Sequence, residues 1–188
     1  MVVEDEPDIY EVLLAMFEMW GIDGVAFVDG EEAVAWIEDV DNGRFRGELP
    51  ELALLDIRLP GNISGPMVAK RLRSSSILGE VAIVLNTAYK LNVEEAAKVM
   101  AEADADELMY KPLPKFNELQ QRLETVIAQR HKKAAEKEKA VVAEAAPAPK
   151  TSSNSKSSSS KTTRAKKRTR ASTRRKSIST QKKRSGKA

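Results

Sequence analysis

The stretch LALLDIRLPG at residues 52–61 decides the fold of this chain. Its first four residues are all apolar, and such an unbroken run is typical of a strand in a parallel sheet that is covered on both faces. The run ends at Asp56, so a carboxylate lies at the carboxyl end of a buried strand. In an open parallel sheet the functional site lies at the carboxyl ends of the strands. Asp56 is therefore the first candidate for a functional residue.

Similar apolar runs lie on both sides of this stretch, and helical patterns separate them. The runs predict further strands at residues 2–3, 25–28, 81–85 and 108–110. Apolar residues at spacings of three and four predict helices within residues 9–20, 33–37, 67–78, 93–100 and 119–127. Five strand–helix units in about 130 residues predict an α/β fold, a doubly wound five-stranded parallel sheet with right-handed crossovers and helices on both faces.

Polar residues end the other predicted strands as well. Glu4 and Asp5 follow the first strand, Thr87 closes the fourth and Lys111 closes the fifth. Clustered carboxylates raise one another's pKa unless a cation joins them, and an oxygen-rich set without Cys suits Mg²⁺. The ammonium and the hydroxyl suit phosphoryl oxygens. This chemistry predicts that Asp56 is a nucleophile that becomes an aspartyl phosphate.

Four motifs in the chain resemble those of a known family, the receiver domains of bacterial two-component response regulators, of the chemotaxis-receiver type. The motifs are VVEDEP at residues 2–7, LLDIRLPG at 54–61 with Gly65, NTA at 86–88 and YKPL at 110–113. They occur in the family's order and at nearly its spacing, over the chain as far as about Ile127. The resemblance implies a flavodoxin-like sheet of strand order 2-1-3-4-5.

The resemblance also implies a role for each matching position. Asp56 would be the phosphoacceptor. Asp5, beside Glu4, would bind the metal directly, and Arg58 would bind it through its backbone carbonyl. Thr87 and Lys111 would bind phosphoryl oxygens, and the small Ala88 would leave space for the incoming group. Asp56 is expected to contact the metal too. The implied cofactor is Mg²⁺, and the implied donor is a histidine kinase or a phosphotransfer protein that phosphorylates Asp56.

The chain departs from the family pattern in two places. Only residues 1–3 precede the acidic pair, fewer than receivers usually have, so we expect a start codon placed too late or a trimmed chain. The family's switch aromatic, three residues before the lysine, is here Leu108. Strand side chains alternate, so Tyr110 shares a face with Leu108, and both are candidates for the switch. The alternative role for Tyr110 is a packed interface aromatic.

The chain divides by charge at Lys150. From Lys150 to Ala188 there are 15 Lys and Arg and no Asp or Glu, whereas the preceding residues carry 16 Lys and Arg against 28 Asp and Glu, a net charge of −12. We expect three parts: a receiver domain at residues 1–130, a helical extension at 131–146 that is rich in Ala, Lys and Glu, and a disordered tail at 147–188. The tail is rich in Lys, Arg, Ser and Thr, a composition that cannot form a core.

The basic runs of the tail have no aromatic residues between them. This absence argues against stacking on bases and favours contact with phosphate backbones without sequence readout. We therefore expect the tail to bind nucleic acid non-specifically, and a merely solubilising tail is the alternative. The residues expected to make these contacts are Arg164, Lys166, Lys167, Arg168, Arg170, Arg174, Arg175 and Lys176.

Two functions of different class fit these observations. The first is a phosphoacceptor response regulator that transmits a signal through protein contacts, of which a phosphorylation-dependent homodimer is one option. Such a protein catalyses only its own phosphorylation and dephosphorylation and is otherwise no enzyme. The second is a nucleic-acid-associated structural protein that uses a receiver fold as a docking or dimer module. No run approaches the ~20 apolar residues that span a bilayer. Acidic residues 4–6 lie where a signal peptide needs positive charge, so a cytoplasmic location is expected.

Overall fold

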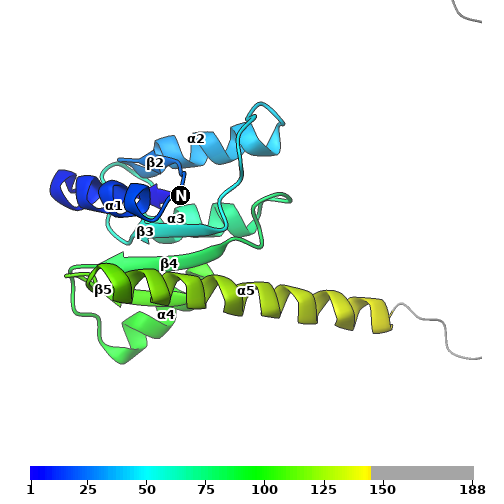
Figure 1. The fold of residues 1–188 in the computed structure, drawn as a ribbon. Helices are drawn as coiled ribbons and strands as arrows, with labels where there is room; N and C mark the ends of the chain where they lie inside the picture. The colour runs from blue at the N-terminus through cyan, green and yellow to red at the C-terminus, as the bar shows by residue number, and fades with distance from the viewer. Residues whose placement is uncertain (145–188) are drawn as a thin grey trace, which may run out of the picture. The chain divides into compact units, whose positions relative to one another are not determined.

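Strands and helices alternate along the chain in the computed structural model, which describes residues 1–144 (Figure 1). The strands are β1 (Val2–Val3), β2 (Ala26–Phe27), β3 (Leu52–Asp56), β4 (Ala82–Thr87) and β5 (Glu107–Tyr110). The helices are α1 (Pro7–Met19), α2 (Gly30–Asp41), α3 (Gly65–Arg73), α4 (Val93–Ala103) and α5 (Phe116–Glu144). All strand pairs are parallel, and their order is β2-β1-β3-β4-β5. The predicted fold and strand order are confirmed.

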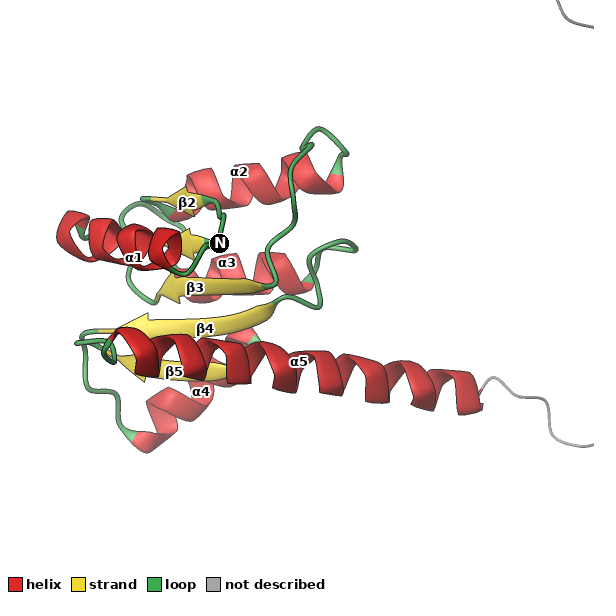
Figure 2. Cartoon of the chain, in the orientation of Figure 1, coloured by secondary structure: helices red, strands yellow, loops and turns green. Residues whose placement is uncertain are grey.

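Helices cover both faces of the sheet, because successive side chains of each strand point to opposite faces. On β3, Ala53 and Leu55 pack into a cluster with buried residues of α2, α3 and α4. Leu54 points the other way, into a cluster with Leu13 of α1 and Leu119 of α5. Figure 2 shows α1 and α5 on the near side of the sheet and α4 behind it. The unbroken apolar runs of the sequence thus correspond to strands that are buried on both faces.

The first strand is central and short. Val2 and Val3 pair with both β2 and β3, and the backbone pairing continues on both sides of them. Leu54 N donates to Met1 O at 3.0 Å, and Glu4 N donates to Phe27 O at 3.1 Å. Hydrogen bonds outside the strand proper therefore help to hold the first acidic residue at the edge of the sheet.

A network of buried charges joins α3, β5 and α5 at the amino-terminal edge of the sheet. Asp106, immediately before β5, accepts hydrogen bonds from Arg73 Nη2 and from Ile83 N, both at 3.0 Å. Arg130 of α5 has only 3% of its surface exposed, and its Nη1 lies 3.6 Å from Asp106 Oδ1. Arg130 Nη2 also donates to Gly79 O at 3.1 Å. The network fixes α5 against the domain about halfway along the helix.

The helix α5 continues well past this network to Glu144, the last described residue (Figure 1). The boundaries expected at residues 130 and 146 stay predictions. The basic tail lies outside the described residues. Within residues 1–144, no helix combines the length and the apolar character needed to cross a bilayer.

Removing the central carboxylate of the network should destabilise the fold. In Asp106→Ala, Arg73 and Arg130 each lose their buried carboxylate partner and keep only exposed carboxylates and backbone carbonyls, and breaking a buried ion pair costs about 3–5 kcal/mol. Urea unfolding of the variant and the wild type measures the difference. The control is Glu102→Ala, which removes an exposed pair with Lys98 at 3.9 Å and should cost less than about 1 kcal/mol. Equal losses in the two variants would contradict the role given to Asp106.

Candidate functional site

The carboxyl ends of the strands meet at one edge of the sheet, where the arrowheads of β3, β4 and β5 point (Figure 2). Lys111, directly after β5, reaches back across this edge. Its Nζ donates to Glu4 Oε1 at 2.8 Å, to Glu6 Oε1 at 2.8 Å and to Asp56 Oδ2. Glu4 has none of its surface exposed and Asp56 has 5%, so the lysine neutralises carboxylates that are shielded from water.

Three carboxylates at this edge could hold a metal ion. One oxygen from each of Glu4, Asp5 and Asp56 lies within 4.8 Å of the others. Asp5 is exposed while the other two are buried, so a cation would have access from one side. The three carboxylates and the ammonium of Lys111 together carry a net charge of −2. An all-oxygen set of this charge fits a small divalent cation such as Mg²⁺.

Burial and ion pairing shift the ionisation of the site. Burial raises the pKa of Glu4 above its usual value, and the hydrogen bond from Lys111 works against that rise. For Lys111, burial acts to lower the pKa, but the hydrogen bonds to Asp56, Glu4 and Glu6 outweigh it, so the pKa is raised above its usual value. Lys111 therefore remains a cation at neutral pH.

Backbone amides hold the two remaining groups of the site. Arg58 N donates to Asp56 Oδ1 at 2.8 Å, and Tyr89 N donates to Thr87 Oγ1 at 3.1 Å. The side chains of the two donors also meet, with the Arg58 guanidinium 3.7 Å from the centre of the Tyr89 ring. The loops that follow β3 and β4 thus fix the acceptor side chain and the hydroxyl relative to each other.

A glycine approaches the site so closely that no side chain fits. A Cβ atom on Gly65, the first residue of α3, would lie 1.9 Å from the carbonyl oxygen of Asp56. Gly65 N also donates to Ile57 O at 3.3 Å. Gly65 therefore lets α3 begin directly against the end of β3.

The switch candidates lie on β5 opposite the site strand β4. Leu108 pairs with Leu85 and packs against the cluster of α2, α3 and α4, whereas Tyr110 pairs with Thr87 and has 43% of its surface exposed. The pairing places Tyr110 beside Thr87, whose hydroxyl is predicted to bind phosphoryl oxygens. The roles of both residues, and of the Arg58 carbonyl as a ligand, stay predictions.

The structure adds three residues that the sequence reasoning did not assign. Glu6 accepts from Lys111, Tyr89 holds Thr87 through its backbone, and Asn86 Nδ2 donates to Glu4 Oε2 at 3.4 Å. Glu6 and Asn86 lie inside the quoted motifs, and this position could have identified them as residues near the site. Tyr89 follows the NTA motif without any distinguishing pattern.

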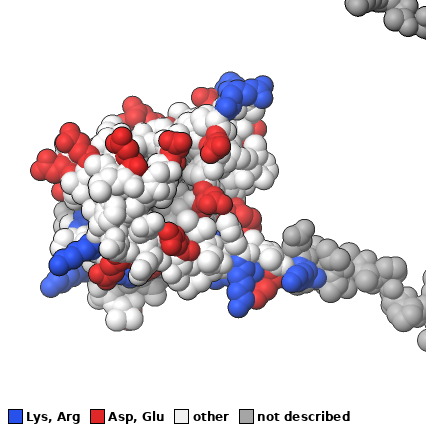
Figure 3. Space-filling view, in the orientation of Figure 1, with Lys and Arg blue, Asp and Glu red and all other residues white. Residues whose placement is uncertain are grey.

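Acidic side chains are concentrated in the amino-terminal part of the chain. Residues 1–43 contain 13 Asp and Glu and no Lys or Arg. In the view of Figure 3, acidic side chains gather over α1 and α2, and the basic ones lie at the margins. Fields of one sign raise the local concentration of counter-ions, so the surface favours the approach of a cation to the three carboxylates.

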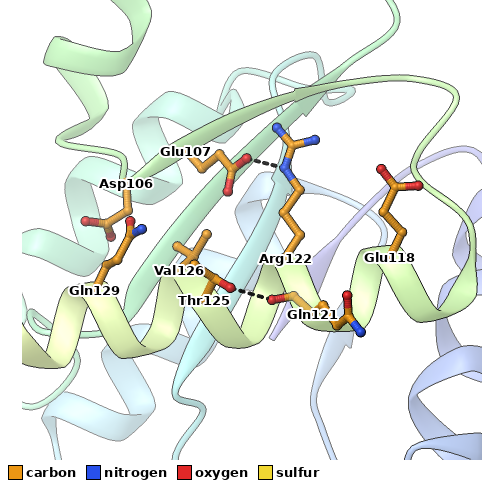
Figure 4. Close-up of a pocket in the computed structure, with 8 residues that line it drawn as sticks. All are labelled: Asp106, Glu107, Glu118, Gln121, Arg122, Thr125, Val126 and Gln129. Atoms are coloured by element: carbon orange, nitrogen blue, oxygen red, sulfur yellow. Dashed lines mark hydrogen bonds and ion pairs between the residues drawn. The ribbon is translucent and has the colours of Figure 1, made fainter.

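A hollow lies away from this site, between β5 and α5 (Figure 4). It has a volume of about 520 Å³ and is lined by Asp106, Glu107, Glu118, Gln121, Arg122, Thr125, Val126 and Gln129. Arg122 Nε donates to Glu107 Oε1, and Thr125 Oγ1 donates to Gln121 O at 2.7 Å. Arg122 and Glu107 neutralise each other, Asp106 pairs with residues outside the hollow, and none of the lining residues is one predicted from the motifs.

Comparison with known proteins places the chain in a family. Residues 1–124 match the response regulator receiver domain. The chain therefore belongs to the response regulator receiver family, as its motifs predicted, and its relatives are two-component response regulators. Receiver domains are typically phosphoacceptor signalling modules rather than enzymes in the usual sense, and they partner with histidine kinases.

Two curated relatives come from Pseudomonas aeruginosa. The transcriptional regulatory protein AruR is 35% identical over 113 residues, covering 60% of this chain and 43% of that protein. The phosphate regulon transcriptional regulatory protein PhoB is 32% identical over 128 residues, covering 68% of this chain and 50% of that protein. The chain thus spans about half the length of the curated relatives that it matches.

Solved receiver domains have the same fold. The receiver domain of the sensor histidine kinase PA1611 from Pseudomonas aeruginosa, solved with a magnesium ion coordinated in its active-site cleft, is 28% identical. Its TM-score is 0.54, with 68% of this chain and 94% of that chain covered. A putative response regulator from Chloroflexus aurantiacus is 27% identical, with a TM-score of 0.55 and the same coverage. A receiver related to this chain therefore holds Mg²⁺ in its cleft.

A side chain at Gly65 should damage both the fold and the site. In Gly65→Ala the new methyl group would displace the Asp56 carbonyl, and overpacking of this kind costs about 1–3 kcal/mol. Urea unfolding checks the loss of stability. Gly24→Ala is the matched control, because its Cβ would meet no atom within 4 Å and it should unfold like the wild type. A Gly65→Ala variant as stable as the control would show that the close approach is not restrictive.

Proposed function

We propose that this chain is a phosphoacceptor response regulator in which Asp56 takes a phosphoryl group from a histidine kinase or a phosphotransfer protein. The observation that carries the proposal is the position of Lys111 Nζ, in contact with both Asp56 and Glu4 where three carboxylate oxygens lie within 4.8 Å. Membership of the receiver family and the magnesium held by a related receiver support the same function.

The proposed reaction is an attack by an Asp56 oxygen on the phosphorus of a phosphohistidine. The P–N bond breaks, its electron pair returns to the imidazole nitrogen of the donor, and that nitrogen takes up a proton from solvent. A Mg²⁺ ion held by Asp5, Asp56 and Glu4 would supply neutralising charge for the phosphoryl oxygens. The other contacts to the phosphoryl oxygens would come from groups that already lie at the edge of the sheet.

Two of these groups are poised to receive phosphoryl oxygens. Lys111 Nζ contacts an Asp56 oxygen, so a short movement would transfer the ammonium to a phosphoryl oxygen bonded at the same carboxylate. Thr87 Oγ1 accepts a hydrogen bond from Tyr89 N, which leaves its own proton free to donate. Charge-assisted bonds of this kind are about twice as strong as neutral ones, which favours the phosphorylated state.

The first test is direct phosphorylation. Incubation of the full chain with acetyl phosphate and Mg²⁺ should add one phosphoryl group, detected by mass, and Asp56→Asn should abolish it because an amide is a poor nucleophile. Asp23→Asn, which changes an exposed carboxylate elsewhere, should be labelled like the wild type. Equal labelling of Asp56→Asn would refute the assignment and would favour the second function, a receiver fold used only for docking.

We also propose that the basic tail binds polyanions. Its 15 Lys and Arg could neutralise several phosphates, and the counterions released on binding make the affinity dependent on salt. The output of the chain would then differ from that of the relatives named as transcriptional regulators, because the tail has no aromatic or helix-turn-helix signal for sequence readout.

Removal of the tail should abolish binding to nucleic acid. The full chain should bind duplex DNA without sequence preference, and its affinity should fall steeply between about 50 and 200 mM salt. A chain ending at Ala146 has a net negative charge and should be repelled. Fluorescence anisotropy with two unrelated duplexes measures both effects. If the shortened chain binds DNA as tightly as the full chain, the tail serves only for solubility.

A further inference from the structure

A buried amide lies beside the acidic cluster on the central strand β4. Asn86 has 1% of its surface exposed, and it pairs in register with Asp56 of β3. Two and four residues earlier on the same face of β4, Val84 and Ala82 pack into the apolar cluster of α1 and α5. By this alternation, the position of Asn86 continues a face that is otherwise filled by apolar side chains.

The amide of Asn86 is only half satisfied. Its Nδ2 donates to Glu4 Oε2 at 3.4 Å, a long hydrogen bond, and its Oδ1 is buried without a hydrogen-bond partner among the described residues. A buried polar group without partners costs free energy, and an apolar side chain of the same shape would avoid that cost. Packing therefore does not explain an amide here, and the contact with Glu4 does.

The other oxygen of Glu4 is already engaged. Oε1 accepts from Lys111 Nζ at 2.8 Å and from Glu6 N at 3.3 Å, so Oε2 is the oxygen left to the amide. A neutral donor at this oxygen can fix the direction of the carboxylate without adding a second positive charge. The acidic cluster thus keeps the net charge of −2 that attracts a divalent cation.

We propose that Asn86 is a positioning residue of the metal site, in which Nδ2 orients Glu4 and the orphan Oδ1 accepts a hydrogen bond from water of the hydrated cation. The inference rests on the proposed function, because it requires a cation at the acidic cluster. Mg²⁺ keeps several of its waters when proteins bind it, so such a donor is available to Oδ1. Hydrogen bonds at such sites are often long in the free protein and shorten when the ligand is present.

The test measures Mg²⁺ affinity by calorimetry, with Mn²⁺ counted by electron paramagnetic resonance as a second readout. Asn86→Leu, which keeps the size but loses both polar atoms, should weaken binding by at least about tenfold, the lower end of the effect of losing an outer-shell partner. Asn86→Ala should do the same and serves if the leucine variant fails to fold. Asp5→Ala removes an expected direct ligand, so it should weaken Mg²⁺ binding more than either Asn86 variant and serves as the reference.

A matched control separates positioning from stability. Val84→Ala truncates a buried side chain on the same face of the same strand and should lower the urea midpoint while leaving Mg²⁺ affinity unchanged. Unchanged affinity in folded Asn86→Leu or Asn86→Ala would overturn the inference and leave the metal site standing. A wild-type chain that binds no Mg²⁺ would overturn the metal site of the proposed function itself.

Discussion

The attraction between the Lys111 ammonium and the carboxylates around it is the interaction on which the site depends. Glu4 and Asp56 are buried close together, and two buried like charges would favour protonation of one of them. Lys111 contacts both, and its side chain has only 6% of its surface exposed. Lys111 thus supplies a compensating positive charge at a place that is largely shielded from water. Ionised carboxylates are needed both to bind a cation and to attack phosphorus, so both proposed properties depend on the position of this one lysine.

The parallel sheet places that lysine. Lys111 N donates to Thr87 O at 2.8 Å, a backbone bond that continues the pairing of β4 with β5 past the end of β5. The two residues proposed to bind phosphoryl oxygens are thus connected through the backbone, so a backbone shift at one would be transmitted to the other. Tyr110 precedes the lysine and pairs with Thr87, so the exposed aromatic ring lies on the segment that such a shift would move.

The sequence predicted those features that depend on local patterns or on the edge of a parallel sheet. Apolar runs identified the strands, although β2 is limited to Ala26–Phe27 and α3 ends at Arg73, with Leu78 buried in the segment that follows. The convergence of the motif residues followed from the rule that strand ends meet. The strand order came from the resemblance and not from periodicity, which is the same for any order of five buried strands.

Beyond the convergence of strand ends, the individual pairings between side chains distant in sequence could not be predicted. Arg73 and Asp106 are 33 positions apart, and Asn86 and Glu4 are 82 apart. Whether such groups meet depends on how the helices and strands pack, and no local pattern records it. The family motifs located Glu4 because it belongs to a motif, but they could not show which of its oxygens faces Lys111 and which faces an amide.

The two buried charge networks differ in a way that separates a binding site from a structural one. At the amino-terminal edge, Asp106 receives Arg73, Arg130, Lys133 and a backbone amide, so its acceptor capacity is used by the protein. At the carboxyl edge, one lysine faces three or more carboxylates, and negative charge remains in excess. In the amino-terminal network each charged group faces an opposite charge, although Arg130 Nε has no hydrogen-bond partner among the described residues, and the network serves to hold the fold together. A network with excess charge and an orphan acceptor is incomplete without a cation, which is the physical reason to place the chemistry at the carboxyl edge.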